Sequence, residues 1–211
     1  MKPAQNTSIL QADFVHFSYP DKALFSNFSA SIPPQITLIR GGDGCGKSTL
    51  LRLLAGALPL QSGQLHINGI SLQTQPENFM ACVFLAELRT DSFDQLTAPD
   101  YFKLQRSKHA GFNDSVLAEI TDGLGLQEHL HKQLFMLSTG SKRKVFLAAA
   151  LASGAQVTLF DDPFAALDAA SIRFLLGWLD PAARASNRAW VIACHVAPDG
   201  LPLAQIIDLG D

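Results

Sequence analysis

The segment Gly41–Thr49 contains the residue types that bind phosphate groups. It fits the pattern G-x-x-x-x-G-K-[ST], which places glycines, a lysine and a serine in a fixed order. The glycines let successive backbone N–H groups turn toward a phosphate, Lys47 supplies a positive charge beside the β- and γ-phosphates, and the Ser48 hydroxyl can bind Mg²⁺. We predict a magnesium–nucleoside triphosphate site made of Gly41, Gly42, Asp43, Gly44, Cys45, Gly46, Lys47, Ser48 and Thr49.

The sequence on either side of this loop supports that prediction. The short β-branched run Ile36–Arg40 predicts a strand before the loop, and leucines at helical spacing predict a buried helix over Lys47–Leu58 after it. A glycine-rich turn that occurs by chance would need neither a strand before it nor a helix after it. The N-K-x-D motif that guanine recognition usually requires does not occur in the sequence, which favours ATP. Cys45 has no recognisable His or Asn partner, so we interpret it as a small loop residue rather than a nucleophile.

A second candidate segment is the apolar run Val157–Phe160, which is followed by Asp161, Asp162 and Pro163. A carboxylate at the end of such a strand can hold Mg²⁺ directly or through water, and we assign that role to Asp161. Asp162 then stands where a general base or a water-orienting group would face the γ-phosphate. The alternative is a plain strand-end turn in which Asp-Pro starts a loop. The presence of a phosphate loop favours the metal-binding interpretation.

Composition indicates one compact domain. The chain has 211 residues, of which 47% are hydrophobic and 17% charged, which suits one compact α/β domain with a full core, or a core carrying one insertion. The net charge of −3 gives no electrostatic footprint for nucleic acid, so no nucleic-acid partner is expected. The 3 scattered cysteines are typical of reduced cytosolic proteins. Met1–Leu10 lacks the apolar core of a signal peptide, and Val145–Phe160, the most apolar stretch, is too short to span a bilayer.

Strands and helices alternate along most of the chain. The opening third is β-rich, with a tight turn expected at Asn68-Gly69. The expected strands are Gln11–Ser18, Ile36–Arg40, Gln64–Ile67, Val157–Asp161, Ala189–Ala193 and Ala204–Leu209, and later helices are expected at Lys142–Ala152 and Ala169–Leu179. We therefore predict an α/β fold with a P-loop NTPase core, in which residues 1–211 form a single domain. Its sheet is mostly parallel, antiparallel β strands lie at the N-terminus, and a helical subdomain is inserted at about 94–150.

Further short motifs occur in a fixed order along the chain. Leu137–Lys142 resembles the L-S-G-G-Q signature of the ATP-binding subunits of ATP-binding cassette (ABC) transporters, and Ala166-Leu167-Asp168 resembles their D-loop. His195 corresponds to the family's switch histidine and Tyr19 to its adenine-stacking aromatic residue. Each has a plain alternative, since Tyr19 could be a half-buried strand aromatic and His195 a core histidine. The ordered set, from Tyr19 to the C-terminus, resembles the family far more specifically than any one motif.

This resemblance implies a composite active site. In the family, the signature of one subunit closes over ATP held by the phosphate loop of a second subunit. Ser138, Thr139 and Gly140 would therefore face the partner's nucleotide, and Asp168 would help to join the halves. The implied partners are a second ATP-binding chain, expected as a head-to-tail homodimer, and a separate integral membrane transporter subunit. The implied cofactors are ATP and Mg²⁺, and the implied location is cytoplasmic, peripheral to the cell membrane through the partner.

The sequence departs from the family pattern at positions that affect turnover. Asp162 stands where the family usually has Glu, and its side chain is shorter by one C–C bond of about 1.5 Å, so hydrolysis is expected to be slow. Thr139 replaces the first glycine of the signature and Ser141 replaces its glutamine. Glu87, after the expected strand Val83–Ala86, takes the place of the catalytic Q-loop glutamine by position alone, and a plain surface glutamate is the alternative.

The leading functional hypothesis is an energy-coupling ATPase. ATP would close the pair of subunits, hydrolysis would reopen it, and a membrane partner docked near Glu87 and the helical insertion would move a solute. The layout is similar to subunits of small exporters, including those of cytochrome c maturation. An alternative is an ATP-gated dimerising interaction module with slow or no hydrolysis. A soluble phosphoryl-transfer kinase is a third hypothesis, but it leaves the signature, Asp168 and His195 without a role.

Overall fold

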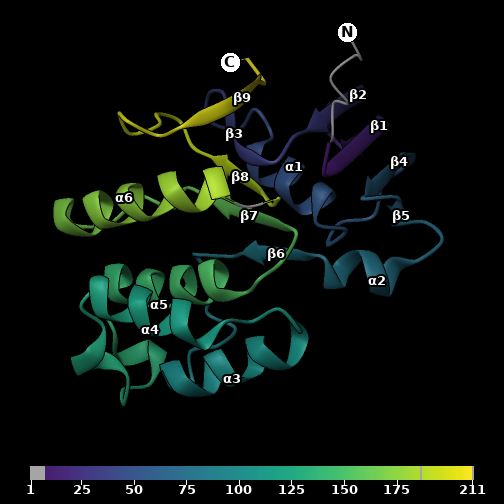
Figure 1. Cartoon of the computed structure of the whole chain (residues 1–211). Coiled ribbons are helices and arrows are strands. Elements are labelled where there is room, and N and C mark those ends of the chain that lie inside the picture. The colour runs from purple at the N-terminus through teal and green to yellow at the C-terminus, as the bar shows by residue number, and fades with distance from the viewer. Residues whose placement is uncertain (1–7, 186, 211) are drawn as a thin grey trace, which may run out of the picture.

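A parallel sheet forms the centre of the molecule (Figure 1). In the computed structural model, which describes residues 8–185 and 187–210, its strands lie in the order β6-β7-β8-β3-β9. These strands are β6 (Val83–Ala86), β7 (Val157–Asp161), β8 (Ala189–Ala193), β3 (Gln35–Arg40) and β9 (Leu203–Asp208). All residues of β8 are buried, as expected for a strand covered on both faces. The predicted parallel sheet is confirmed.

An antiparallel sheet packs beside it at the N-terminal end of the chain. Its strands lie in the order β2-β1-β4-β5 and are β1 (Leu10–Tyr19), β2 (Lys22–Ile32), β4 (Ser62–Ile67) and β5 (Ile70–Ser71). The expected turn joins β4 to β5, with φ of +46° at Asn68 and +84° at Gly69. Two positive φ angles match the tight hairpin turn that Asn-Gly favours.

Helices cover the parallel sheet on both faces. α1 (Lys47–Leu54) contacts β7 and β8, whereas α5 (Thr139–Ala152) contacts β6 and α6 (Ala169–Ala185) contacts β3. The remaining helices are α2 (Pro76–Ala81), α3 (Ala98–Lys108) and α4 (Asp114–Gly123), with short 3₁₀ turns at Gln127–His129 and Leu134–Met136. Figure 1 shows α3 and α4 beyond α5, on the side of the molecule away from β1.

The parallel sheet separates one apolar cluster from another. Toward α5 and α6, Phe160 and Trp190 belong to a buried cluster that includes residues of both helices. Toward α1 and the antiparallel sheet, Leu159 and Val191 belong to a different cluster. Neighbouring residues of a strand point to opposite faces, so β7 and β8 each contribute to both clusters. This packing fixes the carboxyl ends of β3, β7 and β8 relative to α1.

The structure corrects the ends of several expected helices. α1 ends at Leu54 rather than Leu58, because Gly56 adopts φ +69°, the left-handed conformation in which helices commonly end. α5 begins at Thr139 rather than Lys142, because the Ser138 hydroxyl accepts a hydrogen bond from the backbone N–H of Ser141 (3.1 Å) and caps the helix there.

α6 also continues past its expected end at Leu179. It runs through Pro181 to Ala185, and Leu175, Leu179 and Ala183 are all buried at helical spacing. Burial of this apolar stripe extends the helix beyond the point where sequence propensity predicts a stop.

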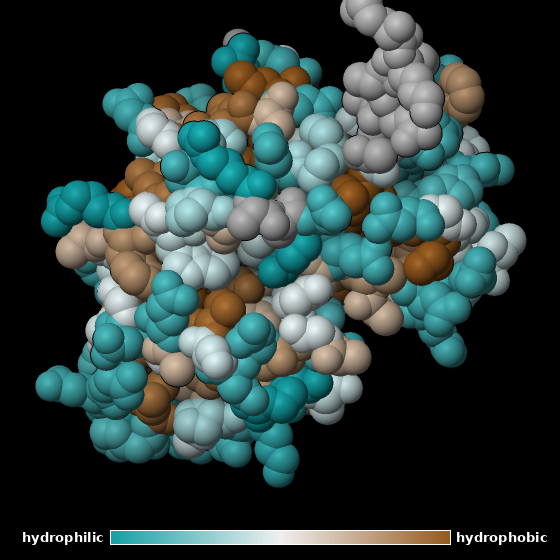
Figure 2. Space-filling view, viewed as in Figure 1, coloured by the Kyte–Doolittle hydropathy of each residue, from teal (hydrophilic) through white to brown (hydrophobic). Residues whose placement is uncertain are grey.

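On the face seen in Figure 2, hydrophobic areas are scattered in small groups among hydrophilic residues. Within the described residues, none of the helices combines the length and hydrophobicity needed to cross a lipid bilayer.

Candidate nucleotide site

The phosphate loop joins β3 to the N-terminus of α1, as its sequence predicts. The Lys47 Nζ donates hydrogen bonds to the carbonyl oxygens of Gly41 and Gly42, each at 2.7 Å, and so holds the loop around itself. Gly46 stands at the N-cap with φ +106°, a conformation that side-chain-bearing residues rarely adopt. The first N–H groups of α1 and the helix dipole therefore point toward the loop, which makes this end of the helix suited to an anion.

A cavity of about 620 Å³ lies against this loop, and we refer to it as the nucleotide cavity. It brings together residues that the sequence analysis selected from distant segments. Those that line it are Tyr19, Asp43, Gly44, Gly46, Lys47, Ser48, Thr49, Asp161, Asp162 and His195. The parallel sheet explains this convergence, because the loops that follow β3, β7 and β8 leave neighbouring strands at the same edge. Gly41, Gly42 and Cys45 belong to the loop but do not line the cavity.

Tyr19 lies at the edge of this cavity with part of its ring exposed. Its hydroxyl is 3.3 Å from the Thr49 Oγ1, and its ring packs edge-on against Phe17 with centroids 5.0 Å apart. The side chain is therefore held in place while 44% of the residue remains exposed. An exposed, fixed aromatic ring is the arrangement that base stacking requires.

Ser48 and Asp161 present oxygen atoms on the same side of the loop. Both line the nucleotide cavity and also a neighbouring cavity of about 330 Å³. A hydroxyl and a carboxylate are ligands that Mg²⁺ accepts, alongside phosphate oxygens and water. These residues therefore fit the metal-binding roles that the sequence predicts for them.

His195 and Cys194 lie just beyond the end of β8. The His195 Nδ1 is 3.5 Å from the Gly41 carbonyl oxygen, so the ring reaches the start of the phosphate loop. Burial, followed by the nearby Asp162 carboxylate, raises the pKa of the Cys194 thiol to about 11. This thiol stays protonated at neutral pH and is a packing group rather than a nucleophile.

Asp162 has a neighbour that no sequence motif predicts. The Arg89 guanidinium pairs with its carboxylate, with Nη2 and Oδ2 2.8 Å apart. The Asp162 backbone adopts φ +54°, and its N–H donates to the Ala193 carbonyl oxygen at 2.7 Å. The buried Arg143 donates to the Ala165 carbonyl oxygen at 2.6 Å and so holds the chain just after Asp162. Residues 89 and 162 are far apart in the sequence, so no motif or residue spacing indicates their contact. Arg89 could therefore not be identified from the sequence.

Lys22 is a further cation that the sequence analysis missed. It lines the nucleotide cavity from the start of β2 and donates a hydrogen bond to the Gly44 carbonyl oxygen at 2.9 Å. Its position three residues after Tyr19 is the only sequence signal that could have suggested it.

Glu87 follows β6, as expected, but does not line the nucleotide cavity. Its carboxylate lies 3.7 Å from the Arg52 guanidinium on α1. It lines the smaller cavity that contains Ser48 and Asp161. Glu87 is thus near the predicted metal ligands, while Arg89, two residues later, is the side chain of this loop that enters the nucleotide cavity.

The signature residues lie outside the nucleotide cavity. Ser138, Thr139 and Gly140 form the start of α5, and a side chain at Gly140 would approach the Ala166 carbonyl oxygen to 2.6 Å. Asp168 is close to the same helix, because its carboxylate pairs with the Lys144 Nζ at 2.7 Å. This hydrogen bond, with others from Ser171, holds the pKa of the Asp168 carboxyl well below its usual range. The structure therefore places the predicted site residues in separate groups.

The tight contact at Gly140 gives a stability prediction. We expect Gly140→Ala to lower the free energy of unfolding by about 1–3 kcal/mol, because the added methyl group must displace backbone. Gly177→Ala is the matched control, since Gly177 lies inside α6 with open space around it, and it should raise the same quantity by about 0.5–1 kcal/mol. Urea denaturation measures both changes in the free energy of unfolding. Equal changes in the two variants would contradict the close contact between position 140 and the Ala166 carbonyl oxygen.

Comparisons with known proteins agree with this geometry. The sequence matches the family model described as ABC transporter over residues 25–165. It is 32% identical over 143 residues to the cytochrome c biogenesis ATP-binding export protein of Xylella fastidiosa, covering 68% of this chain and 66% of that protein. It is 32% identical over 170 residues to the spermidine/putrescine import ATP-binding protein of Thermotoga maritima, covering 77% of this chain and 45% of that protein.

Solved structures share the fold. An ATP binding subunit of an ABC transporter superposes with a TM-score of 0.80 at 20% identity, covering 90% of this chain and 80% of that chain. A putative ABC transporter ATP-binding protein from Pyrococcus furiosus gives a TM-score of 0.75 at 22% identity, covering 95% and 96%. These matches confirm the predicted P-loop α/β fold.

Proposed function

Because this chain belongs to the ABC transporter family, we propose that it binds and hydrolyses ATP to power the transport of a solute by a separate integral membrane protein. The observation that carries the proposal is the convergence of Lys47, the Asp161–Asp162 pair and His195 on one cavity at the phosphate loop. The relatives above are named for import or export, which favours transport over an ATP-gated interaction module or a kinase.

We assign separate chemical roles to residues of the cavity. Lys47 and the N–H groups at the start of α1 bind the β- and γ-phosphates, and Tyr19 stacks on the base. Ser48 and Asp161 would hold Mg²⁺, which when bound would neutralise charge on the phosphate oxygens. Asp162 orients a water molecule and accepts its proton as the water oxygen bonds to the γ-phosphorus, and the bond to the ADP oxygen breaks. His195 contacts the γ-phosphate from the end of β8.

The complete site needs a second copy of the chain. Ser138, Thr139 and Gly140 lie outside the nucleotide cavity of their own chain, on a helix N-terminus with Ser138 as its cap. A head-to-tail homodimer would bring this end of α5 over ATP held by the partner's phosphate loop, where its N–H groups would bind phosphate. Asp168, fixed by Lys144, would lie at the junction between the copies.

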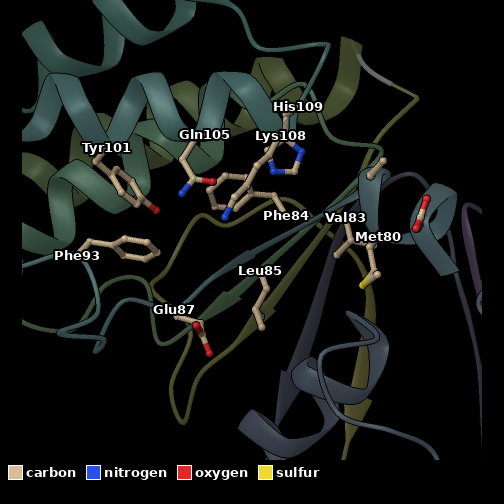
Figure 3. Close-up of a pocket in the computed structure, with 12 residues that line it drawn as sticks. Met80, Val83, Phe84, Leu85, Glu87, Phe93, Tyr101, Gln105, Lys108 and His109 are labelled. Carbon is tan, nitrogen blue, oxygen red and sulfur yellow. The ribbon is translucent and has the colours of Figure 1, made fainter. Parts of the chain in front are cut away.

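The membrane partner docks in a groove of about 560 Å³ that Figure 3 shows in close-up. α2 and β6 line the groove together with α3, so it lies between the sheet and the helical segment at about 94–150, which we treat as a subdomain within the single domain. Its lining is mixed: Phe84 and Leu85 are apolar, whereas Glu77, Glu87 and Lys108 are charged. The His109 ring lies tilted against Phe84, with ring centroids 5.0 Å apart.

The groove is also lined by a buried polar side chain, His109. The His109 Nδ1 is buried and has no hydrogen-bond partner among the described residues. Burial, followed by the Lys108 charge, lowers the pKa of His109, which favours the neutral ring. A docked segment that carries both apolar and charged side chains would match the lining of the groove. Docking there would place the chain at the membrane surface, and membership of the family favours the cytoplasmic face.

Co-purification in mild detergent from the native membrane tests the proposal. We expect an integral membrane protein to be recovered with the chain, and Met80→Glu at the exposed rim of the groove to reduce its recovery about tenfold or more, since an unpaired carboxylate is costly in an apolar contact. Ile206→Glu is the control, because Ile206 is similarly exposed (48% against 45%) but lies on β9, away from the groove. Recovery of no membrane protein, or equal loss with both variants, would contradict docking at this groove.

A further inference from the structure

Arg89 is a cation of the nucleotide cavity that belongs to none of the recognised motifs. It lies in the loop after β6 and lines the cavity together with Lys47, Asp161 and Asp162. It also lines the neighbouring cavity that contains Ser48 and Asp161. The guanidinium is therefore at the end of the cavity where β7 terminates, which is the end that the predicted metal ligand and general base occupy.

The two lysines that line the nucleotide cavity are bound to the backbone. Lys47 donates to the Gly41 and Gly42 carbonyl oxygens, and Lys22 donates to the Gly44 carbonyl oxygen. The buried Arg143 donates to the Ala165 carbonyl oxygen and is not among the residues that line the cavity. Arg89 differs from them because its partner is a carboxylate, Asp162, at 2.8 Å.

The Arg89–Asp162 pair is easily broken. The Arg89 side chain is 66% exposed, and the Asp162 side chain is 36% exposed. Exposed ion pairs contribute little to stability, since water replaces each partner at small cost. Arg89 can therefore leave Asp162 for a better acceptor without disturbing the fold.

A terminal phosphate is such an acceptor. It carries more charge than a carboxylate and presents oxygens in the geometry that the planar guanidinium binds in a bidentate manner. A γ-phosphate near Asp161 and Asp162 would otherwise face two carboxylates, and a guanidinium between the anions reduces this repulsion. A diphosphate lacks the terminal phosphate that would meet Arg89 here.

We propose that Arg89 is a specificity-determining residue that distinguishes ATP from ADP. On triphosphate binding, its guanidinium moves from the Asp162 carboxylate to the γ-phosphate, and Asp162 is left free to face water. This inference rests on the proposed function, because it requires nucleotide in the Lys47 cavity. It adds a contact that forms with the triphosphate alone.

Isothermal titration of Arg89→Met with the β,γ-imido analogue of ATP and with ADP, both with Mg²⁺, tests the proposal. The triphosphate analogue is expected to bind about tenfold more weakly than to the wild type, a change of about 1.4 kcal/mol. ADP should bind within about twofold of the wild type, since Arg89 does not reach it. Arg89→Lys should recover part of the loss, because it keeps the charge but not the planar fork.

Arg184→Met is the matched control. Arg184 forms a similar exposed pair with Asp180, at 2.6 Å, on α6 and away from the cavity. The Arg184→Met substitution should leave the affinities for the triphosphate analogue and for ADP unchanged. Circular dichroism should show the native fold for every variant, since both arginines are exposed.

The outcomes separate this inference from the proposed function. Equal weakening of both ligands by Arg89→Met, or no weakening of either, would overturn the role of Arg89 while the wild type still binds nucleotide. Failure of the wild type to bind either ligand, or unchanged binding by Lys47→Ala, would overturn the proposed function and this inference together.

Discussion

Lys47→Ala is expected to abolish ATP binding, with a loss of affinity of about a hundredfold or more. Lys47 is the cation at the centre of the phosphate loop, and hydrogen bonds to charged groups contribute about 1.5–3 kcal/mol each, so losing its contacts to two phosphates accounts for a change of this size. Equilibrium binding of a fluorescent ATP analogue measures the effect. The loop itself should survive, because the Gly41 and Gly42 carbonyl oxygens that Lys47 binds can turn to water.

Lys103→Ala is the control for this experiment. Lys103 is an exposed lysine on α3 that does not line the nucleotide cavity, so its loss changes the net charge equally without touching the site. Unchanged ATP affinity in Lys47→Ala would overturn the whole assignment of the site. A loss of affinity in both variants would indicate a general effect of charge rather than a specific contact.

The elements at the centre of the candidate site could be predicted from the sequence because their determinants are local. A phosphate loop needs glycines at fixed spacing and a helix directly after it, and both are visible within Ile36–Leu54. β7 is also visible locally, since an apolar run ending in carboxylates has few other interpretations. The start of α5 is also set locally, because the Ser138 hydroxyl accepts from the Ser141 N–H and caps the residues that follow it.

Other features depend on contacts that sequence spacing does not record. β2 has no clean alternation of buried and exposed residues, because bulges shift its register against β1, and the sequence analysis did not identify it. α2 is short and was also missed. Arg89 lies far along the chain from Asp162, and only the pairing of β6 with β7 brings these residues together.

The predicted site residues lie in separate groups, and this separation is what the proposed head-to-tail pair of subunits requires. Residues after β3, β7 and β8 share a cavity because their strands are neighbours, whereas α5 begins elsewhere and is anchored through Lys144 and Asp168. The start of α5 need not move toward the nucleotide cavity of its own chain if a second copy of the chain supplies its signature residues to that cavity. Binding and turnover are then separable, since one chain can hold the phosphates while hydrolysis depends on the pair and on Asp162.

Asp162→Asn is expected to lower ATP hydrolysis about a hundredfold or more, because a general base typically contributes 10²–10⁴-fold. The backbone supports a clean comparison. Asp162 has φ +54°, and asparagine tolerates this left-handed conformation as aspartate does, so the substitution removes charge with little change in backbone energy. Release of inorganic phosphate measures turnover, and ATP affinity should be retained.

Asp162→Glu is expected to raise hydrolysis above the wild type. The added methylene extends the carboxylate by about 1.5 Å toward a water at the γ-phosphate. It also moves the carboxylate relative to Arg89, and glutamate is less suited than aspartate to φ +54°, so a lower melting temperature should accompany the gain. If the wild type and both variants bind ATP and dimerise with it but none turns it over, the energy-coupling proposal fails. Asp162 would then serve an ATP-held assembly rather than catalysis.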